Sequence, residues 1–389
     1  MTEKQHIEIN PAVLIWARER LGLSPTTAAE RLEISVRSLE KFEAGLQKPT
    51  LEELKNFSKV YKRTIATLLL EKPPKEKPFP KDRRTVESKE LNVFNEKTIL
   101  AVRKARALAE SFIELNKENN IPIKNFRKII SKIAPQISIN EEPFKLADEF
   151  RKRMNLNELR DISNTKLALE ASIERIENLG IAVFQISLNE DQLRGFSLVD
   201  EEIPVIVIKR GDQPTGKIFT LFHELGHIIL NEGGLCDISL SPASQKIEKW
   251  CNSFAAEILV PKEELISFPL VVDQSTSGKK EWRKSKLIEI GKHFHVGPLV
   301  ILRRLLDSNL TSISYYKEKH ERWNKPSHGF GKSEGRNIPK ETINEKGKTY
   351  VGLAFSAFDH NRINLKDLSD YLGIKISYLD KTRQLLHTV

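Results

Sequence analysis

His223, Glu224 and His227 form the pattern His-Glu-x-x-His, whose residue types and spacing can bind a metal ion and move a proton. On a helix, residues four apart share one face and lie one turn apart. Two imidazoles in this register can bind one Zn²⁺ ion, and a glutamate between them can take a proton from a water that the ion holds. The pattern therefore predicts a zinc-dependent hydrolase, provided that the chain supplies a third ligand.

The residues around this pattern predict a buried helix. From Phe219 to Leu230 the remaining positions are apolar, apart from one threonine and one glycine. A helix that is apolar on every side is buried. Burying a polar group without a partner costs on the order of 2 kcal/mol or more. A bound metal ion would satisfy the two histidines and the glutamate together.

A second helix, expected between Glu248 and Pro261, could supply the third ligand because apolar residues recur in it at helical spacing. Glu248 and Asn252 lie four residues apart on one face. Glu248 could complete the metal shell, and Asn252 could hold a ring nitrogen of a ligand histidine. Glu257 is a competing carboxylate, and spacing alone does not choose between the two glutamates.

Four segments of this region together resemble the ImmA/IrrE family of zinc metallopeptidases. They are Arg194–Leu198, Pro204–Ile208, Phe219–Leu230 and Glu248–Pro261. That family is similar to thermolysin-like enzymes at the metal site. The resemblance implies that His223, His227 and Glu248 are the metal ligands, that Glu224 is the catalytic base, and that Glu257 is not a ligand.

The same resemblance implies a function. The cofactor would be Zn²⁺, with Mn²⁺ as a second choice, and the substrate would be a specific regulatory protein, such as an XRE-type repressor or an antitoxin. Its cleavage would relieve transcriptional repression in stress response, phage defence or toxin-antitoxin control. The alternative hypothesis is a DNA-binding regulator that cleaves nothing and whose metal site is structural or sensory.

The N-terminal residues 1–70 carry a separate pattern. Ser35 to Pro49 resembles the helix-turn-helix of the XRE/Cro repressors, in which the helix from Ser35 to Phe42 would enter the major groove. The resemblance implies that Arg37, Ser38 and Lys41 face DNA. Because these seventy residues hold 11 Lys or Arg and 9 Asp or Glu, we expect weak DNA binding, or binding as a homodimer. A protein-contact role for the same helices is the alternative.

Positive charge is concentrated further along the chain. Of a net charge of +10, residues 271–350 contribute eight, with 17 Lys or Arg against 9 Asp or Glu. Leu287 to Leu305 resembles a second helix-turn-helix, within a basic segment at 271–320. Arg303 and Arg304 there could meet phosphates or an acidic protein. His293 and His295 are expected on the surface.

We predict an α+β protein that is predominantly helical, with a small mixed sheet beside the metal-binding helix. Its expected strands are Ile181–Ser187, Gly195–Val199 and Val205–Lys209, which are short and rich in Val, Ile and Phe. The expected divisions are a helix-turn-helix domain at 1–70, a Pro- and Lys-rich linker at 71–90, a zincin-like peptidase domain at 91–270, the basic segment at 271–320 and a C-terminal helical module at 321–389. No internal repeat of useful period is evident.

Composition agrees with these divisions. A chain of 389 residues with 39% apolar content supports two or three domains with ordinary cores. Cys236 and Cys251 are too few for a disulfide framework. The polar N-terminus has no export signal, and no apolar stretch is long enough to span a bilayer. We therefore expect a cytoplasmic protein with protein and DNA partners and no membrane contact.

Overall fold

The computed structural model describes residues 6–79, 95–133, 139, 142–188, 193–231, 233–235, 242–323 and 336–387. The chain divides into two compact units, one formed by Met1–Phe79 with Lys89–Val102 and the other by Pro80–Ser88 with Arg103–Val389. Within the expected linker, residues 73–79 contain no helix or strand, and residues 80–90 lie outside the described part of the chain.

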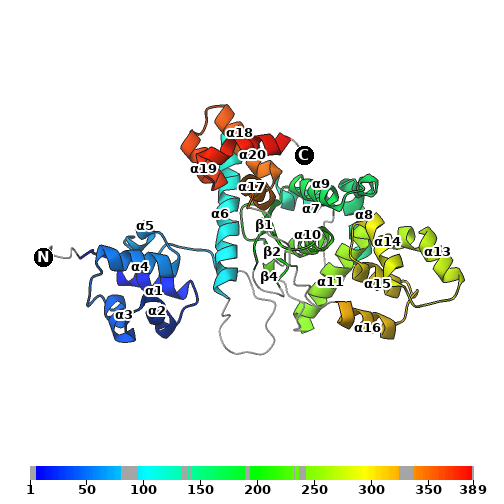
Figure 1. The fold of residues 1–389 in the computed structure, drawn as a ribbon, viewed down its shortest axis with the longest axis horizontal. Helices are drawn as coiled ribbons and strands as arrows, with labels where there is room; N and C mark the ends of the chain where they lie inside the picture. The colour runs from blue at the N-terminus through cyan, green and yellow to red at the C-terminus, as the bar shows by residue number, and fades with distance from the viewer. Residues whose placement is uncertain are drawn as a thin grey trace. The chain divides into compact units, whose positions relative to one another are not determined.

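The first unit contains a helical domain, as expected (Figure 1). Its helices are α1 (Pro11–Glu19), α2 (Pro25–Leu32), α3 (Val36–Glu43), α4 (Leu51–Tyr61) and α5 (Ile65–Leu68). Polar residues begin these helices because their side chains accept hydrogen bonds from otherwise unpaired backbone N–H groups, as Ser24 does from Thr27. The buried guanidinium of Arg18 lies 2.7 Å from the Glu43 carboxylate, which ties α1 to the end of α3.

A small mixed sheet forms the centre of the second unit (Figure 1). Its strands are β1 (Ala182–Ile186), β2 (Gly195–Leu198), β3 (Val205–Lys209) and β4 (Gly234–Leu235), in the order β1-β3-β2-β4. β1 and β3 are parallel, whereas β2 is antiparallel to both of its neighbours. The three expected strands are present with ends that differ by at most one residue. β4 was not expected because two residues give no detectable alternation.

Helices cover this sheet and build the core. α10 (Pro214–Ile229) packs on β2, β3 and α9 (Thr165–Glu177), and α11 (Pro242–Leu259) packs between α10 and α8 (Pro143–Arg153). Apolar residues of all these helices and of β1 and β3 join one buried cluster. The metal-binding pattern therefore lies on a helix in the middle of the core.

The other elements of this part are mostly helices. They are α6 (Glu96–Glu118), within which the two units divide, α7 (Phe126–Ile133), η1 (Leu156–Asp161), α12 (Lys262–Ile266), α13 (Pro269–Thr276), α14 (Lys284–Phe294), α15 (Pro298–Asp307), α16 (Ile313–Trp323), α17 (Ile338–Lys346), α18 (Lys348–Asp359), α19 (Leu365–Leu372), η2 (Ile376–Tyr378) and α20 (Leu379–His387). The prediction of a predominantly helical α+β protein is confirmed. Within the described residues, every helix is too short or too polar to cross a bilayer.

Candidate functional site

The helix α10 presents both histidines from inside the protein. Pro214 occupies its first turn, where a missing N–H costs nothing, and Asn231 turns the chain away just beyond its end with φ 54°. Every residue from Thr220 to Ile229 is buried. The apolar neighbours of His223 and His227 fix the helix against the sheet and against α11, so both imidazoles have fixed positions.

The helix α11 approaches α10 closely because Gly226 has no side chain. A Cβ atom at Gly226 would lie 3.2 Å from Sγ and 3.3 Å from Cα of Cys251. Cys251 is completely buried at this contact. The close approach brings Glu248, three residues before Cys251, to the histidines of α10.

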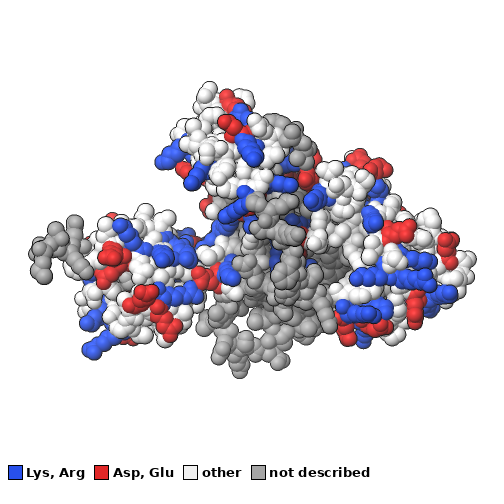
Figure 2. All heavy atoms as spheres, viewed as in Figure 1, with Lys and Arg blue, Asp and Glu red and all other residues white. Residues whose placement is uncertain are grey.

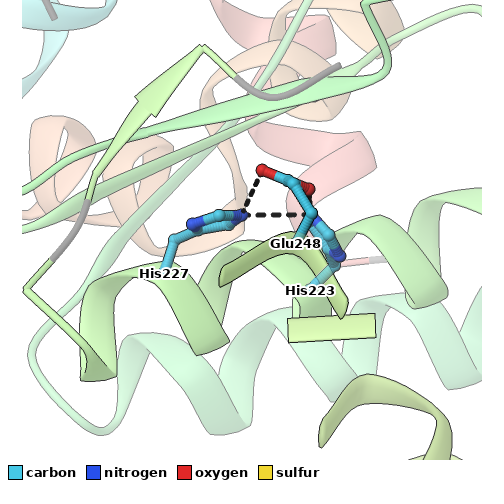
Figure 3. A group of neighbouring side chains, drawn as sticks. All are labelled: His223, His227 and Glu248. Carbon is cyan, nitrogen blue, oxygen red and sulfur yellow. Dashed lines mark hydrogen bonds and ion pairs between the residues drawn. The ribbon is translucent and has the colours of Figure 1, made fainter. Parts of the chain in front are cut away.

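The three expected ligands converge on one point (Figure 3). Nε2 of His223 lies 3.2 Å from Nε2 of His227. Nε2 of His223 also lies 3.2 Å from Oε2 of Glu248, and Nε2 of His227 lies 3.2 Å from Oε1 of Glu248. Among the described residues, these three form a group of side chains with metal-ligand spacing. Figure 3 shows the two imidazoles turned toward each other, with the carboxylate beside both.

The electrostatics of this group depend on burial and on the opposite charges. Burial raises the pKa of Glu248, but hydrogen bonding to His223 and His227 and their positive charge outweigh burial and hold this pKa below its usual range. Burial lowers the pKa of His223, and the interactions with Glu248 and Glu224 outweigh it and raise that pKa. The carboxylate therefore stays charged and available as a ligand.

The residues fit a tetrahedral metal ion. Two donor atoms that are each about 2.0 Å from a tetrahedral ion lie about 3.3 Å from each other, close to the 3.2 Å between the two ring nitrogens and between each nitrogen and its nearer Glu248 oxygen. The buried oxygen Oε1 of Glu248 has no hydrogen bond of normal geometry among the described residues. An ion at the centre would occupy its lone pair. Two imidazoles and one carboxylate are donors that zinc accepts, with a fourth position left for water or substrate.

Glu224 lies beside this group and is almost completely buried. Burial raises the pKa of Glu224 above its usual value. The positive charges of His227 and His223 and the hydroxyl of Ser197 oppose this rise but do not cancel it. The Ser197 hydroxyl is close enough to act on Glu224, although Oγ makes no hydrogen bond of normal geometry among the described residues.

Gly195 allows β2 to lie against α10 at Glu224. A Cβ atom at Gly195 would come within 2.6 Å of Cγ2 of Thr220, 2.7 Å of the Val207 oxygen and 3.4 Å of Oε1 of Glu224. Spacing alone did not identify Gly195 or Ser197 as part of the site. Both stand in the segment Arg194–Leu198 that carried part of the family resemblance, and that segment was the available signal.

The remaining polar residues of α11 have separate positions. Asn252 is exposed and lies close enough to His223 to help raise the pKa of this histidine. Nδ1 of His223 and Nδ1 of His227 have no hydrogen-bond partner of normal geometry among the described residues. Glu257 lies away from the cluster, where it accepts a hydrogen bond from Arg304 of α15.

Two expectations for the basic segment were wrong. Arg304 is buried, donating to the Val260 oxygen at 2.9 Å and to Glu257, so it cannot meet phosphates. His295 is also buried, and its Nε2 lies 2.8 Å from the Leu159 oxygen. Sequence patterns did not reveal these partners because each lies more than forty residues away along the chain.

The expected DNA-contacting residues lie on α3. Arg37 and Lys41 are exposed, whereas Ser38 is half-buried and its hydroxyl lies 2.8 Å from the Ser35 hydroxyl, at the start of the helix. On the visible face of α1 to α5, Figure 2 shows acidic and basic side chains interspersed, not one continuous positive surface. This distribution agrees with the small charge surplus of residues 1–70.

Comparison with known families supports both parts of this description. Residues 176–306 match the peptidase family described as the IrrE N-terminal-like domain, and residues 14–68 match a helix-turn-helix family. The resemblance expected from the sequence is thereby confirmed for these two segments. No curated protein and no solved structure matches the chain significantly.

Proposed function

Taking the peptidase and helix-turn-helix matches as the starting point, we propose that this chain is a zinc-dependent endopeptidase in which His223, His227 and Glu248 hold the ion. The observation that carries this proposal is the convergence of the two ring nitrogens, 3.2 Å apart, with a Glu248 carboxylate that has one oxygen 3.2 Å from each nitrogen. Zn²⁺ suits this donor set, and Mn²⁺ is the second choice because carboxylate and imidazole ligands also accept it.

The chain's own residues supply proton transfer and positioning. When bound, such an ion polarises a peptide carbonyl and lowers the pKa of water. Glu224 would accept the proton of the attacking water on a carboxylate oxygen and deliver it to the leaving amide nitrogen. Gly195 and Ser197 keep β2 against this carboxylate, and Asn252 would orient His223 from the outer side of the site.

The substrate we propose is a specific regulatory protein, an XRE-type repressor or an antitoxin, whose cleavage relieves transcriptional repression. The helix-turn-helix at residues 14–68 supports this substrate class, since such a domain can bring the peptidase to its target by pairing with a similar domain or by binding the same operator. Arg37, Ser38 and Lys41 would contact DNA in the second case. We place this activity in stress response, phage defence or toxin-antitoxin control.

Incubation of the purified chain with repressors encoded beside its gene tests this function. The chain is loaded with Zn²⁺ or Mn²⁺, and fragments are identified by mass spectrometry. Glu224→Gln should abolish cleavage while metal content stays at the wild-type level. The matched control is Glu263→Gln, which changes an exposed glutamate of α12 in the same way.

The alternative function, a regulator without proteolysis, predicts a different result. The metal-loaded wild type would then bind operator DNA and leave every repressor intact, and Glu224→Gln would change neither property. Cleavage that continues in Glu224→Gln would also reject the proposed mechanism, because no proton acceptor would remain at the position we assign to it.

A further inference from the structure

The turn between α19 and α20 has the same backbone conformation as the turn of the N-terminal helix-turn-helix. Gly373 stands 340 residues after Glu33, and these residues have φ values of 65° and 58°. Two residues further, Lys375 and Ser35 are both extended, with φ/ψ of −64°/148° and −72°/150°. Each extended residue begins the next helical segment.

The hydrogen bonds that close the two turns also correspond. The Ile34 N–H donates to the Ala29 oxygen at 3.1 Å, and the Ile374 N–H donates to the Ser369 oxygen at 3.2 Å. A left-handed residue followed by this bond is a common way to end a helix. The acceptors, Ala29 and Ser369, are both small residues.

Four buried positions of the two segments correspond. At the same offset of 340 residues, the pairs Ala28 and Leu368, Leu32 and Leu372, Leu39 and Leu379, and Phe42 and Thr382 are all buried. α18 packs on both α19 and α20, as a third helix of the module. Within the C-terminal segment, α18, α19 and α20 thus form a three-helix arrangement with a helix-turn-helix, and it lies outside both matched families.

The outer surface of the second helix is polar in both segments. The positions that correspond to Arg37, Ser38 and Lys41 are Ser377, Tyr378 and Lys381. Ser377 and Lys381 are exposed, Tyr378 is partly exposed, and Gln384, one turn beyond Lys381, is exposed. Residues of this kind read base edges and phosphates when such a helix lies in the major groove.

The pair α14 and α15 has the same turn but a less polar outward face. His295 has φ 55°, and the Val296 N–H donates to the Gly291 oxygen at 2.9 Å. Here two of the three outward positions hold the half-buried apolar residues Leu299 and Val300, and the third holds the exposed Arg303. The C-terminal copy differs because Ser377, Tyr378 and Lys381 are all polar.

We propose that residues 336–387 are a second DNA-binding module, which contacts duplex DNA through the exposed residues Lys375, Ser377, Lys381 and Gln384. This span holds nine Lys or Arg and six Asp or Glu, three positive charges in excess, so one module alone would bind DNA weakly. Together with the N-terminal domain it gives the chain two DNA contacts, whose combined affinity exceeds that of either contact.

Fluorescence anisotropy of the full-length protein with a labelled 40-base-pair duplex of random sequence tests this module. The starting variant is Arg37→Ala/Lys41→Ala, which removes the exposed cations of α3. It should retain DNA binding through the C-terminal module. Adding Lys375→Ala/Lys381→Ala should weaken the remaining affinity at least about tenfold and reduce the slope of log K against log salt by about 1.8, for two lost phosphate contacts.

The control adds Lys340→Ala to the same starting variant, since Lys340 is an exposed lysine of the same module on α17. Its affinity and salt slope should be unchanged. Circular dichroism melting must show that all variants fold equally well. Equal DNA affinity and salt slope with and without Lys375→Ala/Lys381→Ala would overturn the proposal, and so would complete loss of DNA binding in Arg37→Ala/Lys41→Ala. Either result would assign the module to protein contacts.

Discussion

Replacing Arg304 by methionine should destabilise the peptidase unit far more than the same change at the adjacent Arg303. Arg304 has a side chain only 8% exposed and pairs with Glu257, which is 16% exposed. Arg303 is 53% exposed, and its partner Asp307 is 35% exposed. Breaking a buried ion pair from one side costs about 3–5 kcal/mol, whereas exposed pairs contribute about 0–1 kcal/mol.

The contacts that remain place the expected loss near the lower end of that range. Without the guanidinium, the Val260 oxygen loses a donor at 2.9 Å and the Glu257 carboxylate loses its charged partner. Glu257 keeps a 3.3 Å hydrogen bond from the Lys262 N–H, which limits the cost. We therefore expect a loss of about 3 kcal/mol for Arg304→Met and less than about 1 kcal/mol for Arg303→Met.

Urea unfolding followed by circular dichroism measures both losses as shifts of the midpoint at constant slope. The double variant Arg304→Met/Glu257→Gln should lose less than the sum of its two single variants, by about 1 kcal/mol or more, because no charge is left without its partner. Equal losses for Arg303→Met and Arg304→Met would refute the assignment of Arg304 as a structural residue, and additive losses in the cycle would refute the pairing.

Three further predictions concern the site and the C-terminal module. Gly195→Ala should lower the free energy of unfolding in urea by about 1–3 kcal/mol and reduce peptidase activity, because the new Cβ would lie within 3 Å of backbone and side-chain atoms. The control Gly211→Ala, which has open space around its Cβ, should change neither the stability nor the activity. Zn²⁺ at one hundred times its Kd should raise the unfolding free energy by about 2.7 kcal/mol; no shift in wild type, or an equal shift in His227→Ala, would contradict the metal site. Burial lowers the pKa of Lys346 from 10.5 to about 8. Between pH 8 and pH 10.5 the unfolded chain therefore binds more protons than the folded chain. The free energy of unfolding should rise with pH across this range, by up to about 3 kcal/mol. Urea unfolding at pH 7 and pH 10.5 should show this rise in Lys340→Met and not in Lys346→Met; equal behaviour of the two variants would contradict it.

The part of the site that follows local periodicity could be predicted from the sequence. His223 and His227 are linked by one turn of helix, and the apolar run around them is sufficient to predict that the helix is buried. The choice between Glu248 and Glu257 could not be made in this way, because both suit a helix and the distance to α10 depends on how the two helices pack. Family resemblance distinguished them, and the structure brings Glu248 alone of the two to the histidines.

Features that depend on long-range contacts were predicted poorly. Arg304 is apparent as a buried residue only once α11 is in place, and sequence alone presented it as a basic surface residue. The recurrence of one turn conformation at the ends of several helices was not predicted. Glu33, His295 and Gly373 occupy the same left-handed turn position, yet they share no chemical property that a sequence comparison would detect.

The near contact between Gly226 and Cys251 bears on how quickly the centre can gain or lose its cation. The close backbone contact at Gly226 fixes the distance between α10 and α11. The entropy of ordering the ligand side chains is therefore lost when the chain folds and not when an ion binds. At the metal site proposed above, loading an ion should therefore require no refolding step.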